Sequence, residues 1–210
     1  MSSTRYPVML DLAGRNCLVV GGGAVAARKV RRLSGCDAIV TVIAPDLCEE
    51  LSIAVSNKLV IWSDERYSAI PDLAHGEKWA FVVAATDHSP TNQRVVTEAE
   101  RLGIWANNAS ARNGGAASLP AYRTAGQIGV AVSTNGVHPG AALWLAELLE
   151  KQVPAGLVEL LDLLVELRDG EELDQMARVD WSRVLDSGTL ELVREGQIVE
   201  AKERLEACLL

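Results

Sequence analysis

The sequence predicts an α/β fold in which a doubly wound parallel sheet is followed by a dimerisation segment and a small helical domain. Short apolar runs alternate with amphipathic helical segments in the first half of the chain, a glycine turn follows the first run, and leucine stripes at helical spacing occur in the C-terminal part. The 210 residues, 49% of them hydrophobic, suffice for one sizeable core and a smaller second unit.

The first apolar run, Cys17 to Val20, ends in three consecutive glycines. In a Gly-x-Gly-x-x-Ala arrangement, Gly21 makes the strand-to-helix turn, Gly23 lets a pyrophosphate approach the backbone, and Ala26 lets the helix lie close to the sheet. Apolar residues then recur at i, i+4 and i+7: Ala26, Val30 and Leu33. This context predicts a Rossmann-like domain with NAD as its cofactor.

A second run rich in β-branched residues, Ile39 to Ala44, follows at the spacing of a strand–helix–strand unit. No acidic residue directly ends this run, and Asp46 comes after Pro45. Asp46 either contacts the adenosine ribose or caps a helix over Leu47 to Val55. The choice between NAD and NADP is therefore poorly specified.

Further strands are predicted at Lys58–Trp62, Trp79–Ala85 and Ile104–Asn107, with a helix over Thr91–Leu102. The loops after the strands should converge at one edge of the sheet. Thr86 and Asp87 are predicted at the ribose or nicotinamide end, although Asp87 or Ser89 equally suits a helix cap. The predicted cofactor-binding residues are Gly21, Gly22, Gly23, Ala24, Val25, Asp46, Thr86 and Asp87.

The pattern of apolar and polar residues changes near Asn113. A strand is predicted at Ile128–Ser133, then a loop over Thr134–Gly140, and the remainder is helical. We expect three regions: a nucleotide-binding domain over 1–112, a dimerisation and substrate segment over 113–152, and a helical domain over 153–210. The apolar stripes of the last region comprise Leu157, Leu160, Leu161, Leu164, Val165, Trp181, Val184, Leu185, Ile198, Leu205 and Leu209.

Composition argues against several classes of protein. A net charge of −8 disfavours non-specific nucleic-acid binding, and the basic residues of the first helix, Arg28, Lys29, Arg31 and Arg32, are explained by an exposed polar face. No apolar run reaches the roughly 18 residues of a membrane span. Four cysteines without C-x-x-C spacing, and no signal-like segment, lead us to expect a cytoplasmic protein.

Four phrases of the sequence resemble the precorrin-2 dehydrogenase family, which includes the N-terminal module of siroheme synthase. They are Tyr6–Leu12, Val19–Lys29 with its Gly-Gly-Gly-x-Val-Ala-x-Arg-Lys pattern, Ala84–Asp87 and Val130–Gly136. The resemblance implies oxidation of the tetrapyrrole precorrin-2 to sirohydrochlorin by NAD, followed in some members by insertion of ferrous iron. It also implies a homodimer whose middle segment exchanges contacts between subunits, with the site next to that segment.

The resemblance breaks at one position. The family has an Asp for acid–base work and chelation in a phrase like Asn-Val-x-Asp, and this chain has Asn107-Asn108-Ala109-Ser110. Ser110, predicted at the catalytic position, cannot carry the carboxylate's charge or bind a hard cation comparably. Chelation is therefore in doubt, whereas dehydrogenation depends mainly on the cofactor.

Other candidates lie in the loops. His138 transfers a proton, binds iron or is an exposed turn residue, and no spacing with another His predicts a metal site. The predicted substrate-binding residues are Asn107, Arg112, Ser133 and Asn135, of which the last two are equally suited to turns. Arg112, Arg123 and the basic first helix would steer a polycarboxylate, or are ordinary surface charges. The alternatives are a non-catalytic dinucleotide- or tetrapyrrole-binding protein and an oxidoreductase for another substrate.

Overall fold

A computed structural model describes residues 5–111, 114–168 and 181–209. The chain forms two compact units: Met1–Leu119 with Asn135–Val137, and Pro120–Thr134 with His138–Leu210. The first unit extends to Leu119, beyond the predicted end at residue 112. The predicted division into three regions stays a prediction.

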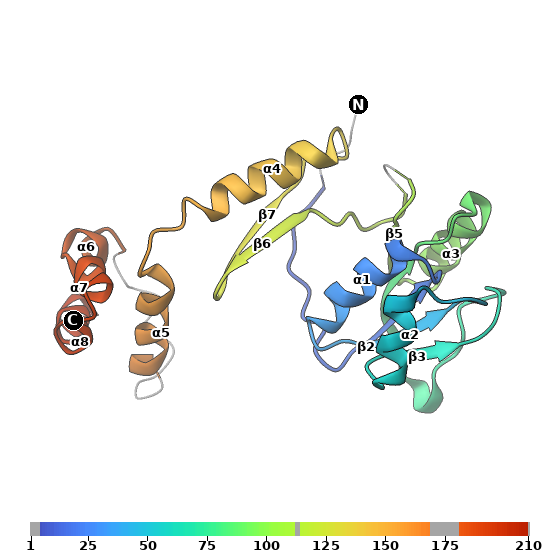
Figure 1. Cartoon of the computed structure of the whole chain (residues 1–210), viewed down its shortest axis with the longest axis horizontal. Coiled ribbons are helices and arrows are strands. Elements are labelled where there is room, and N and C mark those ends of the chain that lie inside the picture. The colour runs from blue at the N-terminus through green and yellow to red at the C-terminus, as the bar shows by residue number, and fades with distance from the viewer. Residues whose placement is uncertain (1–4, 112–113, 169–180, 210) are drawn as a thin grey trace. The chain divides into compact units, whose positions relative to one another are not determined.

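The first unit contains a five-stranded, wholly parallel sheet in the order β3-β2-β1-β4-β5 (Figure 1). Its strands are β1 (Asn16–Val20), β2 (Ile39–Ile43), β3 (Ile61–Ser63), β4 (Trp79–Ala84) and β5 (Trp105–Asn108). The order reverses between β1 and β4, which makes the carboxyl ends of these two strands the expected place for a ligand. The prediction of a Rossmann-like, doubly wound parallel sheet is confirmed.

Helices cover both faces of this sheet. On one face α1 (Ala24–Ser34) and α2 (Glu49–Ser56) pack over one cluster of apolar side chains, and on the other α3 (Ser89–Arg101) packs over a second cluster. Alternate residues of β1 enter the two clusters: Val19 faces α1, and Leu18 faces α3. The central strand is therefore buried on both sides, as the continuous apolar run indicates.

Three predicted boundaries were wrong, each because of local backbone chemistry. β3 begins at Ile61, since Lys58 has a positive φ of 59° and cannot continue a strand. α2 begins at Glu49, with Cys48 rather than Asp46 at its N-cap. α3 begins after His88, which accepts the Thr91 N–H at Nδ1, so neither Asp87 nor Ser89 is the cap.

The second unit begins with an antiparallel hairpin of β6 (Ala121–Ala125) and β7 (Ile128–Val132), along which α4 (Pro139–Glu150) packs (Figure 1). β7 agrees with the prediction, but β6 was missed because its sequence, Ala-Tyr-Arg-Thr-Ala, has no apolar run. Arg123 of β6 forms ion pairs with two carboxylates of α4, at 2.6 Å to Glu147 and 3.8 Å to Glu150. These pairs hold the helix on the hairpin.

The other elements described in this unit are four helices: α5 (Leu157–Arg168), α6 (Trp181–Asp186), α7 (Thr189–Arg194) and α8 (Ile198–Leu209). Of the predicted stripes, Leu160, Leu164, Val184 and Leu205 lie in the core, whereas Val165, Leu185 and Ile198 are exposed. The side chains of Trp181 and Leu209 lie outside the described residues. Helices α5, α6 and α8 all contact α7.

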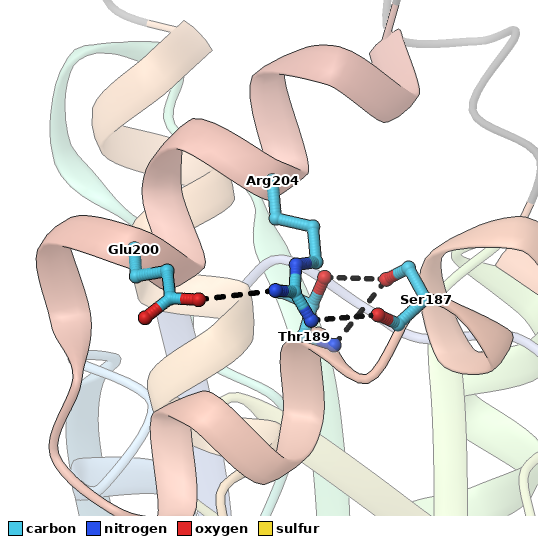
Figure 2. Close-up of polar contacts among 4 residues, drawn as sticks. All are labelled: Ser187, Thr189, Glu200 and Arg204. Atoms are coloured by element: carbon cyan, nitrogen blue, oxygen red, sulfur yellow. Dashed lines mark hydrogen bonds and ion pairs between the residues drawn. The ribbon is translucent and has the colours of Figure 1, made fainter.

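A polar cluster closes the α6–α7 turn (Figure 2). The Ser187 and fully buried Thr189 hydroxyls are 2.5 Å apart, and Arg204 of α8 donates to the Ser187 carbonyl at 3.0 Å while pairing with Glu200 at 3.1 Å. Each of the four residues drawn there has a polar partner, so α8 is fixed to the turn by directional bonds as well as by apolar packing.

Candidate dinucleotide-binding site

The glycine turn after β1 lies against the ends of two neighbouring strands. Gly21 has φ of 127°, and a Cβ there would overlap the carbonyl oxygen of Ala85, the residue after β4. A Cβ at Gly22 would overlap the carbonyl oxygen of Asp46 beyond β2. The Gly21 N–H also donates to Ile43 at 2.9 Å. These two glycines are therefore required by the close approach of backbone to backbone.

Gly23 is different, because a Cβ there would meet nothing within 4 Å and its backbone is extended at φ −87°. It is the N-cap of α1, no side chain caps this helix, and the first turn contains no acidic residue. Gly23, Ala24 and Val25 are all exposed. The first turn of α1 thus leaves backbone N–H groups and the positive end of the helix dipole open to an anion.

Asp46 lies beside this turn, since its backbone occupies the space that a Gly22 side chain would need. Its side chain is exposed, and the N-cap of α2 is Cys48. The capping interpretation is therefore wrong. The remaining interpretation, a contact with the adenosine ribose, is compatible with a carboxylate placed next to the phosphate turn.

The loop after β4 is closed by its own hydrogen bonds. The Thr86 hydroxyl accepts the His88 N–H and approaches the His88 carbonyl, both at 3.2 Å, while His88 caps α3. Asp87 between them is exposed. Thr86 and Asp87 stay predicted cofactor contacts, at an edge that the structure shows to be the carboxyl edge of the sheet.

Asn92, on the first turn of α3, is a functional candidate that the sequence analysis missed. It is fully buried, and its amide bonds both to Thr86 and, at 2.9 Å, to the Ser110 hydroxyl after β5. The signal in the sequence was a polar residue on an apolar helix stripe: Asn92, Val95, Val96 and Ala99 follow at i, i+3, i+4 and i+7.

Ser110 is hydrogen-bonded in both directions. It accepts from the Asn92 amide, and its own hydroxyl donates to Oδ1 of Asn108 at 2.8 Å. Neither partner is a base, so the geometry gives Ser110 no route for its proton and leaves it one lone pair as an acceptor. The predicted acid–base role of Ser110 stays a prediction, and the geometry favours orientation of a ligand.

Asn107 faces the other side of the sheet from Asn108, because the two are neighbours on β5. Its Nδ2 donates to the Ala117 carbonyl at 3.1 Å, and its buried Oδ1 has no donor among the described residues. A buried acceptor without a donor costs free energy that a ligand N–H would recover. The substrate-binding role of Asn107 stays a prediction, and Arg112 lies outside the described residues.

His138 is the N-cap of α4: its Nδ1 accepts the Ala141 N–H at 3.0 Å. Nδ1 then carries no proton in the neutral ring, and Nε2 carries it. Any proton transfer by His138 would therefore use Nε2. Ser133 and Asn135 are exposed, and the φ of 49° at Asn135 is typical of a turn residue.

The basic helix α1 has an unfavourable charge arrangement. Burial, together with the neighbouring charges of Arg32 and Arg28, lowers the pKa of Lys29, while Arg31 pairs with Glu50 at 2.5 Å. An approaching anion would relieve this repulsion. Arg123, by contrast, is already paired with two carboxylates, which makes its predicted steering role weaker.

No group of three His, Cys, Asp or Glu side chains that could hold a metal ion occurs in the described part of the chain. Its cysteines are free, and burial and Cys36 raise the pKa of Cys17 to about 11, as expected of a core thiol. None of the described helices is long and apolar enough to cross a membrane.

An open glycine turn at the switch point of a parallel sheet defines a dinucleotide-binding protein of the Rossmann class. The chain belongs to the family described as putative NAD(P)-binding, whose model matches residues 8–121. This confirms the predicted nicotinamide dinucleotide as cofactor.

Curated relatives extend the match over almost the whole chain. It is 36% identical to the siroheme synthase of Nitrosospira multiformis, over 95% of this chain and 43% of the relative, and 32% identical to that of Nitrosococcus oceani, over 97% and 43%. The chain thus spans less than half the length of these relatives. A solved structure of SirC, precorrin-2 dehydrogenase, matches with a TM-score of 0.64 and 25% identity, covering 97% of this chain and 98% of that one. The predicted family resemblance is confirmed.

Proposed function

We propose that this chain oxidises precorrin-2 to sirohydrochlorin with NAD as the hydride acceptor. The observation that carries the proposal is the match to SirC over nearly the full length of both chains, which leaves no large part of this chain outside the likeness. The open first turn of α1 and the unpaired acceptor on Asn107 support it, because the first suits the phosphate oxygens of NAD and the second suits an N–H donor.

Different residues of the chain would bind the pyrophosphate, bind the ribose and orient the ligand. The N–H groups at Gly23, Ala24 and Val25 would bind the pyrophosphate, and the Asp46 carboxylate would accept from a ribose hydroxyl. When bound, NAD supplies the hydride acceptor. The protein's contribution to that step is orientation, for which Asn107 and Ser110 offer fixed acceptors at the carboxyl edge of the sheet.

We propose that iron insertion is weak. A chelatase must bind a hard cation and accept pyrrole protons, and both tasks suit a carboxylate better than the Ser110 hydroxyl, whose proton is already donated to Asn108.

The test is incubation with precorrin-2 and NAD, following NADH absorbance and the sirohydrochlorin spectrum, with cobalt or ferrous insertion measured separately. We expect NADH and sirohydrochlorin in equal amounts, and slow metal insertion. Tight NAD binding without turnover would favour the non-catalytic binding protein, and NADH formation with another reduced substrate but not with precorrin-2 would favour a different oxidoreductase.

We also propose a homodimer in which a second copy covers α4. This helix buries Ala142 and Ala146 and exposes four large apolar residues: Leu143, Trp144, Leu148 and Leu149. The Trp144 side chain is 64% exposed, which is unusual for an uncovered surface. Sedimentation at micromolar concentration should show a dimer that Trp144→Glu converts to monomer; a monomeric native protein would refute it.

The proposed reaction belongs in the cytoplasm. Free cysteines throughout the described part of the chain, including the exposed Cys36, suit a reducing compartment. Fractionation of cells that express the native protein tests this, and recovery with the membrane fraction would contradict it.

A further inference from the structure

The side chain of Asn92 uses its full hydrogen-bonding capacity. Its Oδ1 accepts the Thr86 N–H at 3.0 Å and the Thr86 hydroxyl at 2.7 Å, and its Nδ2 donates to the Thr86 carbonyl and to the Ser110 hydroxyl, both at 2.9 Å. The residue is completely buried. Two acceptor and two donor positions are all that an Asn amide has.

These bonds join two loops that are distant in sequence. Thr86 belongs to the loop after β4, and Ser110 to the loop after β5, while Asn92 belongs to α3. A buried amide with four bonds has only one orientation, since rotating it would place donors against donors. The two loops therefore hold a fixed relation at the edge of the sheet where the ligand is expected.

We propose that Asn92 is a positioning residue that holds the Thr86 loop and the Ser110 hydroxyl as one unit. By donating to Ser110 it makes this hydroxyl give its proton to Asn108, so that the remaining Ser110 lone pair has a fixed direction toward solvent or a bound donor. That this direction serves hydride transfer rests on the proposed function; the mechanical coupling does not.

Hydrogen exchange tests the coupling without substrate. Asn92→Ala should raise the exchange rate of the Thr86 amide, which loses its acceptor. It should also raise that of the Ser110 amide, which donates to Asn108 Oδ1 and would no longer be held in place through its own hydroxyl. We expect each rate to rise by roughly tenfold or more. The control is Gln93→Ala, an exposed residue on the same turn, which should change neither. A rise at Thr86 alone, or an equal rise throughout β1 and β4, would overturn the proposal.

If Asn92→Ala does not fold, Asn92→Asp replaces it. The carboxylate can still accept the Thr86 N–H but can donate neither to the Thr86 carbonyl nor to the Ser110 hydroxyl, so exchange should rise more at Ser110 than at Thr86. Unchanged exchange at Ser110 in this variant would contradict the coupling.

Turnover then tests the catalytic consequence. Values of kcat are measured for Asn92→Ala, Ser110→Ala and the double variant. Each rate is divided by the concentration of NADH-binding sites, so that unfolded protein does not lower the apparent kcat. We expect each single change to lower kcat by about tenfold, and the double variant to be no worse than about threefold below either, because residues acting through one another are not additive. Additive losses would overturn it. A native protein that binds NADH without oxidising precorrin-2 refutes the proposed function and leaves the exchange result to decide on Asn92.

Discussion

The helices that follow two adjacent strands, β1 and β4, begin in opposite ways. At β1–α1 the N-cap is Gly23, no side chain bonds to the first turn, and a side chain at this position would meet nothing. At β4–α3 the ring of His88 caps the helix, and the buried Asn92 bonds to the loop. One junction leaves its N–H groups to a ligand, and the other satisfies them internally.

The difference separates two ways of building a site. An uncapped glycine junction binds an anion through the backbone, and therefore needs small residues and open space. A capped junction cannot bind an anion in this way, and instead fixes the side chains of its loop. The α1 junction is thus suited to cofactor affinity, and the α3 junction to orientation.

The start of α4 shows which feature of the β4–α3 junction is not shared by another histidine-capped helix. At the start of α4, Thr134 and His138 repeat the contacts of Thr86 and His88, with the same 3.2 Å distances. The fourth residue after the cap is Asn92 in α3 and the buried Ala142 in α4. The histidine cap is therefore a general helix start, and Asn92 is the addition.

The largest effect is expected at Gly21. Gly21→Ala would place a Cβ against the Ala85 carbonyl at a φ of 127°, so we expect a loss of several kcal/mol, on the order of backbone strain plus overpacking, and poor recovery of folded protein. Denaturant unfolding measures it. A variant as stable as the native protein would mean that the turn is not held against β4.

Transferring the Asn92 side chain to α4 is the next test. Ala142→Asn buries an amide where the native chain has a methyl group, and should cost about 1–3 kcal/mol from unpaired polar atoms. The measurement is chemical unfolding followed by circular dichroism, with Ala141→Asn, the same change at an exposed position of α4, as the control. An Ala142→Asn variant as stable as the native protein would show that an amide can be buried here without hydrogen-bond partners already in place.

The chain differs from the family phrase Asn-Val-x-Asp at two positions, Asn108 and Ser110, and the side chains of these two residues are hydrogen-bonded to each other. A carboxylate at position 110 would oppose Oδ1 of Asn108, so Asn108→Val/Ser110→Asp should raise dehydrogenase turnover by about tenfold, or ~1.4 kcal/mol of barrier, and more than Ser110→Asp alone. NADH formation at matched precorrin-2 and NAD concentrations measures it. If native Ser110 is faster than both, another residue such as His138 does the acid–base work.

Much of this could be predicted from the sequence. The parallel sheet, the positions of its strands and the glycine turn follow from apolar runs, helical spacing and a local motif, all of which act over a few residues. The Asn92–Ser110 hydrogen bond could not be predicted, because the two residues are 18 positions apart in the sequence. They meet only when β5 pairs with β4 and α3 packs on these two strands. The missed caps have a related cause: histidine is a rare cap, and its ring nitrogen acts only in the folded backbone geometry.

Removing either histidine cap should have a smaller effect. His88→Ala and His138→Ala should each cost about 1 kcal/mol, and Asn at either position should restore most of it. Thermal unfolding of the four variants is the measurement. A much larger loss for His138→Ala, with activity lost and not restored by Asn, would indicate a catalytic role for Nε2.

The smallest effect is expected from Lys29, and it depends on pH. Because the pKa is lowered in the folded state, the native protein loses this proton before the unfolded chain does, so stability from this group rises with pH between the lowered pKa and the ordinary value of 10.5. Lys29→Met should abolish this alkaline rise and slightly increase stability at neutral pH. An unchanged pH profile would contradict the assignment.

The most direct test of the account is a calorimetric titration of NAD into Gly23→Val and the native protein. Gly23 has open space and an ordinary φ, so the variant should melt as the native protein does. Its branched side chain should exclude the pyrophosphate from the first turn of α1, and the loss of two charge-assisted hydrogen bonds should weaken NAD binding by about a hundredfold. Native affinity in a normally folded Gly23→Val protein would show that α1 is not where the cofactor binds.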